Sequence, residues 1–243
     1  MNPIKIRATD LSGKNLNDEE MNSLSYKKAL KLDKRSYFQY YISLIKKKQL
    51  ILFTFIPTND YNIIHLKIAL FIVSFALYLS INAFFFNDET MHKLYKNNGI
   101  YNILSRIPQI IYSSLISATI NLILKKLSLS EKNILEIKKE GNMELATQKS
   151  KDIKKCIKVK FILFFIISLI LMLFFWYFIS CFCAVYNNTQ IILFKDTLIS
   201  FALSMLYPFG LNLLPGIFRI PALRSKKKDK KCLYSFSGLL ALI

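Results

Sequence analysis

The stretch FILFFIISLILMLFFWYFISCFCAVY, residues 161–186, decides the fold of this chain. It is continuously apolar and exceeds the roughly 20 residues that a helix needs to cross a ~30 Å hydrocarbon core. A strand of a membrane β-barrel would alternate apolar and polar residues, and this stretch does not alternate. The stretch therefore predicts a transmembrane helix.

Three further apolar stretches reach spanning length, at residues 63–86, 107–124 and 197–218. With residues 161–186 they predict an all-α, polytopic integral membrane protein with a four-helix transmembrane bundle inside residues 63–223. The more hydrophilic sequence then falls into an N-terminal segment, 1–62, a middle loop, 125–160, and a tail, 224–243.

The composition agrees with a membrane protein and counts against a nucleic-acid-binding one. The 243 residues are 53% hydrophobic, with a mean hydropathy of +0.33, yet carry a formal net charge of +19. A basic protein that binds nucleic acid would show a binding motif beside its positive charge. Here the lysine clusters flank the apolar stretches and no such motif accompanies them, so we predict no nucleic-acid partner.

The distribution of charge predicts the orientation of the chain. The middle loop has 11 lysines against five acidic residues, and residues 224–231 have six basic residues against one acidic residue. The other two loops are nearly neutral, so basic and neutral sides alternate at each crossing. Because basic loops stay in the cytosol, we expect both termini and the middle loop to be cytosolic. The host membrane stays open.

The N-terminal segment predicts an amphipathic cytosolic helix over residues 18–45, acidic at its start and then basic and aromatic. Two readings remain open for it: the helix lies along an anionic leaflet, with lipid headgroups as its partner, or it packs on the middle loop. Residues 49–57 follow as an apolar piece that is too short to span and ends at a proline, which predicts an elbow at the membrane.

Small and amide side chains recur along the predicted spans at helical spacing, which places them on one face of each helix. They line either a hydrated pathway or the contacts at which helices pack in lipid. This candidate stripe consists of Asn82, Gln109, Ser113, Ser117, Asn121, Ser200, Ser204 and Asn212.

Other reactive or modifiable residues give weaker predictions. Asn187 begins an Asn-Asn-Thr triplet in a short non-cytosolic loop and is a candidate for glycosylation that an enzyme would struggle to reach. Cys156 and Cys232 are candidates for S-acylation, with ordinary free thiols as the alternative. No catalytic, phosphate-binding or metal-binding motif is present, so we predict no catalytic residue, cofactor or metal.

Several stretches carry a resemblance to a known membrane module. The chain resembles the module near the C-terminus of multi-pass membrane proteins of ciliate-type single-celled eukaryotes. The resemblance covers most of the chain from about residue 20 and implies a polytopic membrane protein, but it carries over no site or activity. The stretches are DKRSYFQYYISLIKKKQLILFTF, NDYN, FFFNDETMHKLY, LSLSEKNIL, FCAVYNNTQIILFKDTLISF and YPFGLNLLPGIFRIPAL.

These features favour a non-enzymatic membrane anchor or scaffold. We expect its cytosolic face to bind a protein partner, a second copy of the chain or anionic lipid. The alternative is a small-solute or ion transporter or channel subunit that uses the polar stripes of spans one, two and four.

Overall fold

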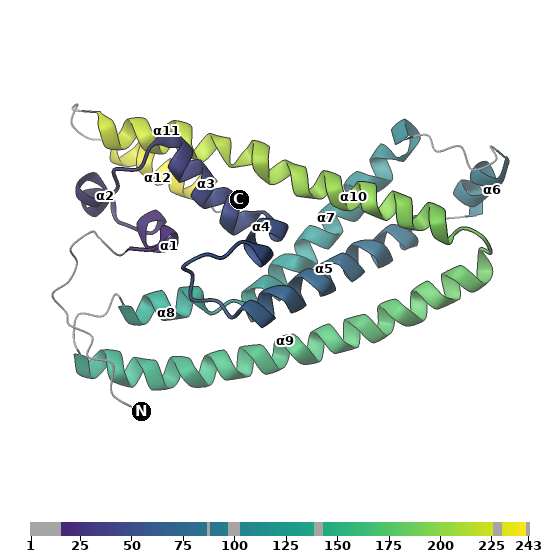
Figure 1. The fold of residues 1–243 in the computed structure, drawn as a ribbon, viewed down its shortest axis with the longest axis horizontal. Helices are drawn as coiled ribbons and strands as arrows, with labels where there is room; N and C mark the ends of the chain where they lie inside the picture. Colours follow the sequence, from purple (N-terminus) through teal and green to yellow (C-terminus); the bar gives the residue numbers. More distant parts are fainter. Residues whose placement is uncertain (1–15, 87, 97–102, 139–142, 226–229, 242–243) are drawn as a thin grey trace. The chain divides into compact units, whose positions relative to one another are not determined.

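The computed structural model describes residues 16–86, 88–96, 103–138, 143–225 and 230–241, which form twelve α-helices and no strand (Figure 1). The prediction of an all-α protein is confirmed. The chain divides into two compact units. Unit 1 contains Met1–Ile63, Ser130–Lys158 and Pro208–Ile243, and unit 2 contains Ile64–Leu129 and Val159–Tyr207.

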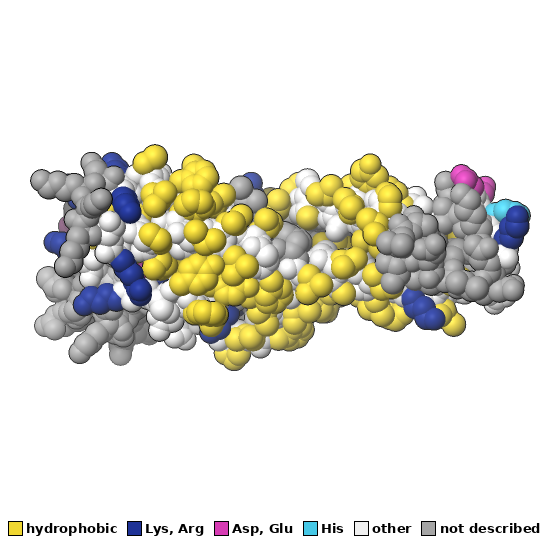
Figure 2. All heavy atoms as spheres, turned by 90° about the horizontal axis from the view of Figure 1, so that it is seen from above, with side chains coloured by type: hydrophobic (Ala, Val, Ile, Leu, Met, Phe, Trp, Pro, Cys, Tyr) yellow, Lys and Arg dark blue, Asp and Glu magenta, His cyan; other side chains and the backbone are white. Residues whose placement is uncertain are grey.

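Four helical segments are long and apolar enough to cross a membrane, so the predicted polytopic bundle is confirmed at this level. They are α5 (Ile64–Phe84), α7 (Ile103–Ser128), α9 (Met143–Val185), and α10 (Gln190–Leu211) continued by α11 (Leu213–Arg224). In Figure 2, hydrophobic side chains form most of the described surface on the visible face and charged side chains are sparse there. Such a surface suits lipid, because exposed apolar patches of this extent are rare on soluble monomers.

Helix α9 is the longest element. Its 43 residues, at 1.5 Å each, make a helix of about 65 Å, roughly twice the thickness of the hydrocarbon core. The predicted span at residues 161–186 is therefore the second part of one helix whose first part carries the lysines of the middle loop. The middle loop is largely helical as a result.

Helix α5 lies at the centre of unit 2. Half of its most apolar window is buried, against 17% for α9. Leu77 and Ile81 of α5 pack with Phe175 of α9, and Tyr78 of α5 makes an edge-to-face contact with Phe201 of α10 at 5.4 Å. The short helix α6 (Asp88–Lys96), in the loop after α5, adds Met91 to a neighbouring apolar cluster.

Unit 1 is built from short helices. The stretch expected as one helix over residues 18–45 is three: α1 (Asp18–Asn22), α2 (Tyr26–Leu32) and α3 (Tyr37–Lys48). Helices α1 and α3 each begin with a capping box, in which Asn17 pairs with Glu20 and Ser36 with Gln39. Each box satisfies backbone N–H groups that a new helix would leave unpaired, so it starts a helix at that point.

The remaining helices of unit 1 come from distant parts of the chain. Helix α4 (Leu50–Phe55) follows α3 directly and occupies the position of the predicted elbow. Helix α8 (Glu131–Lys138) comes from the middle loop, and α12 (Lys231–Leu240) lies within the predicted tail. Helices α11 and α12 lie side by side, and both contact α2 (Figure 1).

The end of the fourth predicted span differs from the expectation of 197–218. Helix α10 begins earlier, at Gln190, and ends at Leu211. Pro215 has no N–H with which to continue the helical hydrogen bonds from Leu211, and the Asn212 side chain instead donates to the Pro208 carbonyl at 2.6 Å. The chain resumes as α11, which belongs to unit 1, so the tail boundary expected at residue 224 falls inside a packed helical pair.

Gly216 of α11 gives a test of how α3 packs on α11. A Cβ at Gly216 would lie 2.6 Å from the Tyr37 ring, whose hydroxyl donates to the Leu213 carbonyl at 2.9 Å. We expect Gly216→Ala to displace this ring and to cost about 1–3 kcal/mol of stability. The measurement is the thermal unfolding midpoint of the purified protein in detergent.

Gly210→Ala is the matched control, because a Cβ at Gly210 meets no atom within 4 Å. It should leave the midpoint unchanged or raise it, since alanine favours a helix over glycine. Equal midpoints for the two variants would contradict the close approach of α3 and α11.

Candidate functional site

Most residues of the candidate stripe in unit 2 contact polar side chains of neighbouring helices. Gln109 of α7 donates to the Asp196 carboxylate of α10 at 3.1 Å, and the Ser113 and Ser200 hydroxyls lie 3.3 Å apart. Asp196, Ser113 and Ser200 are fully buried. In lipid such interhelical hydrogen bonds stabilise packing by about 0.6–2 kcal/mol each.

Helix α5 makes hydrogen bonds of the same kind to α10 and α7. Asn82 donates to the Thr197 hydroxyl of α10 at 3.4 Å, and the Ser74 hydroxyl lies 2.7 Å from Oδ1 of Asn121 on α7. Ser74 lies on the same face of the first predicted span as Asn82, whereas Thr197 was not predicted. The Thr197 hydroxyl could have been found by the same search for small polar residues in the spans.

The other stripe residues do not join these contacts. The Ser204 hydroxyl donates back to the Phe201 carbonyl of its own helix, and the Ser117 hydroxyl has no hydrogen-bond partner among the described residues. Asn212 belongs to unit 1, and its side-chain amide donates to the Pro208 carbonyl at the end of α10. The stripe residues that do contact other helices therefore form three separate sets of hydrogen bonds: α7 with α10, α5 with α10, and α5 with α7.

The structure places the modifiable residues as follows. Asn187 is exposed, but the hydroxyl of Thr189 is buried and donates to the Tyr186 carbonyl, which leaves the triplet's threonine engaged. Cys156 and Cys232 are both exposed free thiols, so both remain accessible for S-acylation. Glycosylation and S-acylation stay predictions.

Unit 1 contains a buried ionic cluster that the sequence did not predict. Arg219 of α11 is 1% exposed and donates to Oδ2 of Asp33 at 2.9 Å from Nη2 and 3.2 Å from Nε. Its guanidinium also donates to the Met21 and Asn22 carbonyls at the end of α1. Arg35 donates to both oxygens of Asp33, at 2.8 and 2.9 Å.

Two tyrosine rings complete the surroundings of Arg219. The guanidinium carbon lies 4.9 Å from the Tyr40 ring centroid and 4.7 Å from that of Tyr234, which is cation–π distance. Tyr40 belongs to α3 and Tyr234 to α12, so Arg219 of α11 contacts three other helices, α1, α3 and α12, as well as Asp33. Arg219 directly follows the fourth predicted span, a position from which an arginine side chain can extend its charge to water, but here its guanidinium is buried against these protein partners.

Burial alone would raise the pKa of Asp33, because it disfavours the charged carboxylate. Hydrogen bonds and charge from Arg35, and then from Arg219, outweigh burial and hold the pKa below its usual value. Asp33 is therefore ionised and pairs with both guanidinium groups, and Asp18, 3.6 Å from Arg35, supplies a second negative charge.

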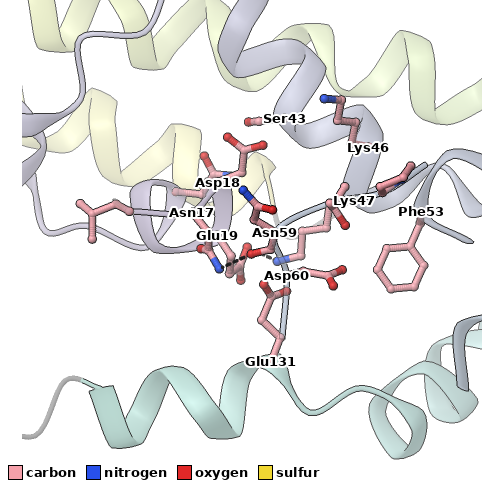
Figure 3. A pocket seen from close by; sticks show the side chains of 14 residues that line it. Asn17, Asp18, Glu19, Ser43, Lys46, Lys47, Phe53, Asn59, Asp60 and Glu131 are labelled. Atoms are coloured by element: carbon pink, nitrogen blue, oxygen red, sulfur yellow. Dashed lines mark hydrogen bonds and ion pairs between the residues drawn. The ribbon is translucent and has the colours of Figure 1, made fainter. Parts of the chain in front are cut away.

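A second feature of unit 1 is a cavity of about 280 Å³ between α1, α3, the loop before α5 and the start of α8 (Figure 3). Four carboxylates and two ammonium groups line it. Figure 3 shows Lys47 reaching toward Glu19 and Asp60, with Glu131 rising from α8 below them. The charged lining residues are Asp18, Glu19, Lys46, Lys47, Asp60 and Glu131.

The local sequence explains how Glu131 reaches this cavity. The side-chain oxygen of Asn62 accepts from the backbone N–H groups of Ser130 and Glu131, at 3.1 and 3.2 Å. The Ser130 hydroxyl donates to the Tyr61 carbonyl at 2.8 Å. A residue before α5 therefore caps the first turn of α8 and fixes Glu131 at the cavity wall.

Glu131 is 7% exposed, and burial raises its pKa to about 7. The charges of Glu19 and Asp60 also raise it, whereas the charge of Lys47 and a hydrogen bond from Asn62 lower it. Lys47 forms its ion pair with Glu19, and within the described part of the chain no basic side chain forms one with Glu131. The Glu131 carboxylate is thus an acid poised to titrate near neutral pH.

Comparison of the chain with protein-family models, with curated proteins and with solved structures finds no match. The resemblance to a protist membrane module therefore stays a prediction. Function has to be inferred from the geometry of the two units.

Loss of the Asp33 charge tests the buried cluster. Removing one partner of a buried ion pair leaves the other charge uncompensated, so we expect Asp33→Asn to cost about 3–5 kcal/mol of stability. Asp152→Asn, at an exposed position on α9, is the control and should change stability by less than about 0.5 kcal/mol. Similar thermal midpoints for both variants would refute a stabilising role of the cluster.

Glu131 predicts a pH dependence of stability. Its folded pKa, about 7, lies above the ordinary value of 4.5, so the folded state holds a proton that the unfolded state releases between these values. The contribution of Glu131 to stability is therefore present below pH 4.5 and is lost as the pH rises through 7. We expect Glu131→Gln to raise the unfolding midpoint relative to the native chain at pH 7.5 more than at pH 5. A difference that is independent of pH would contradict the assignment.

Proposed function

We propose that the protein is a non-enzymatic membrane scaffold, with four spans, both termini in the cytosol, and unit 1 as its cytosolic binding part. Unit 1 combines the N-terminal segment, part of the middle loop and the tail, which their positive charge assigns to the cytosol, with α11, the end of the fourth spanning segment. An even number of spans between these segments agrees with their grouping in one unit.

The observation that carries the proposal is the use of polar side chains in the spans. Gln109 pairs with Asp196 and Ser113 with Ser200 across helices, and all of these residues except the half-buried Gln109 are buried. Groups that hydrogen-bond one another in this way hold helices together and are not directed toward a passing solute. We therefore favour packing as the role of the stripe, and binding by unit 1 as the function.

The surface of unit 1 offers a basic patch for anionic lipid or an acidic partner. We define the basic patch as Lys27, Lys28, Lys31 and Lys34, all exposed on α2 and the turn after it. Phe38, on α3, follows the basic patch closely in sequence and is 71% exposed. It supplies an apolar group of the kind that enters a headgroup region. Each lysine near an anionic surface contributes about 1 kcal/mol to attraction.

A transporter or channel subunit is the second candidate function. Oδ1 of Asn82 and the Ser117 hydroxyl are buried and have no hydrogen-bond partner among the described residues. Unpaired polar atoms at membrane depth favour water or a solute beside them, since each costs free energy when left unpaired. These two atoms are the observation that favours the pathway alternative.

Lipid selectivity tests the scaffold proposal. We expect the purified protein to retain phosphatidylserine over phosphatidylcholine in native mass spectrometry. Changing the four lysines of the basic patch to glutamine should remove most of this preference. The same change at Lys151, Lys154, Lys155 and Lys158, four exposed lysines of α9, is the charge-matched control and should preserve more of it.

Reconstitution into vesicles separates the two functions. The scaffold proposal predicts no ion or small-solute flux above that of protein-free vesicles. Flux that disappears on Asn82→Leu or Asn121→Leu would instead establish the pathway. No preference for phosphatidylserine together with such flux would overturn the scaffold function.

A further inference from the structure

The cavity of unit 1 concentrates acidic side chains in a chain that is otherwise strongly basic. The whole chain has 34 basic and 15 acidic residues, yet the cavity is lined by four carboxylates and two ammonium groups. Its other polar lining residues include Asn17 and Asn59, whose amide oxygens and carbonyls also accept hydrogen bonds. The lining therefore favours a positively charged hydrogen-bond donor.

Two of these carboxylates already have cationic partners. Glu19 forms an ion pair with Lys47, and Asp18 lies 3.6 Å from the Arg35 guanidinium. The Lys47 ammonium lies among the carboxylates in Figure 3, so the cavity already accommodates one ammonium group.

Glu131 has no such cationic partner among the described residues. It is 93% buried, it points from α8 into the cavity, and no basic side chain of the described residues forms an ion pair with it. Burying a carboxylate without a cation is costly, and the site avoids this cost only by keeping the acid neutral or by binding a cation. A buried acid at a cavity wall that has no cationic partner among the described residues is thus an independent indication of a ligand.

The geometry argues against a metal ion as this cation. Among the described residues, no three side chains of the types His, Cys, Asp and Glu are grouped closely enough to hold a metal. The carboxylates instead surround a space of about 280 Å³, just below the roughly 300–1,000 Å³ of pockets for drug-sized molecules. A small organic cation fits both the size and the spread of acceptors.

We propose that the cavity of unit 1 binds the ammonium group of a small primary amine, which pairs with Glu131. The amine donates to the Glu131 carboxylate and to neighbouring oxygens of the cavity wall. This inference goes beyond the scaffold function and does not rest on it, since it requires only that unit 1 is folded.

The charges around Glu131 give the proposal a pH signature. Glu19, Asp60 and Lys47 are the charged groups that act on Glu131 from α1, the loop before α5 and α3, and Asn62 hydrogen-bonds to it. Since the acid titrates near pH 7, its ionised fraction rises about tenfold between pH 6 and pH 8, whereas an alkylamine stays protonated throughout. Affinity should rise by about the same factor over this range.

The experiment uses the full chain in detergent and n-butylamine as the probe, with calorimetry as the readout. We expect saturable binding that strengthens about tenfold from pH 6 to pH 8 and is at least tenfold weaker in Glu131→Gln. Glu136→Gln, an exposed acid on the same helix, is the charge-matched control and should bind as the native chain does. Uncharged n-butanol should not bind.

The source of the ammonium is decided by a second probe, a blocked glycyl-lysyl-glycine peptide. Tighter binding of the peptide supports a lysine side chain as the natural source, and tighter binding of butylamine supports a free amine; both support the ammonium site. The proposal is overturned by absence of saturable butylamine binding, by a flat pH profile in the native chain, or by equal losses in Glu131→Gln and Glu136→Gln. The pH profile needs no variant, so it holds even if Glu131→Gln fails to fold.

Discussion

The ion pair between Arg219 and Asp33 is the interaction on which unit 1 depends. It joins residues 186 positions apart, one between α2 and α3 and the other in α11. The same guanidinium contacts the end of α1 and the rings of Tyr40 and Tyr234. A buried pair of charges tolerates few arrangements, because each displaced hydrogen bond leaves a charge uncompensated. The pair therefore fixes how the N-terminal and C-terminal segments pack.

The two units use polar groups in contrasting ways. In unit 2, hydroxyl and amide groups pair between apolar helices, as Ser113 and Ser200 do, and this suits a surrounding of lipid. In unit 1, the buried charges are paired in the cluster around Asp33 or lie around the cavity with Glu131. The charged groups suited to binding a ligand or partner are thus concentrated in unit 1, whereas the polar groups of unit 2 bind one another. This difference between the units is the physical reason for preferring a scaffold to a transporter.

The parts of the structure that local sequence determines were predictable. Residues 161–186 are apolar enough that only a helix satisfies their backbone in lipid. The start of α3 was also predictable, since Ser36 and Gln39 have the residue types and spacing of a capping box. By contrast, the partner of Arg219 and the docking of α12 on α11 depend on contacts between distant segments. The positions of charged residues in the sequence do not show which distant residues pair in the fold.

The direct test of this account is hydrogen–deuterium exchange of the native chain and of Arg219→Met. If Arg219 holds unit 1 together, the amides of α2, α3 and α12 should lose protection together in the variant. Those of α5, in unit 2, should stay protected, because local openings follow cooperative units. Loss of protection confined to α11, or an equal loss in α5, would contradict the account.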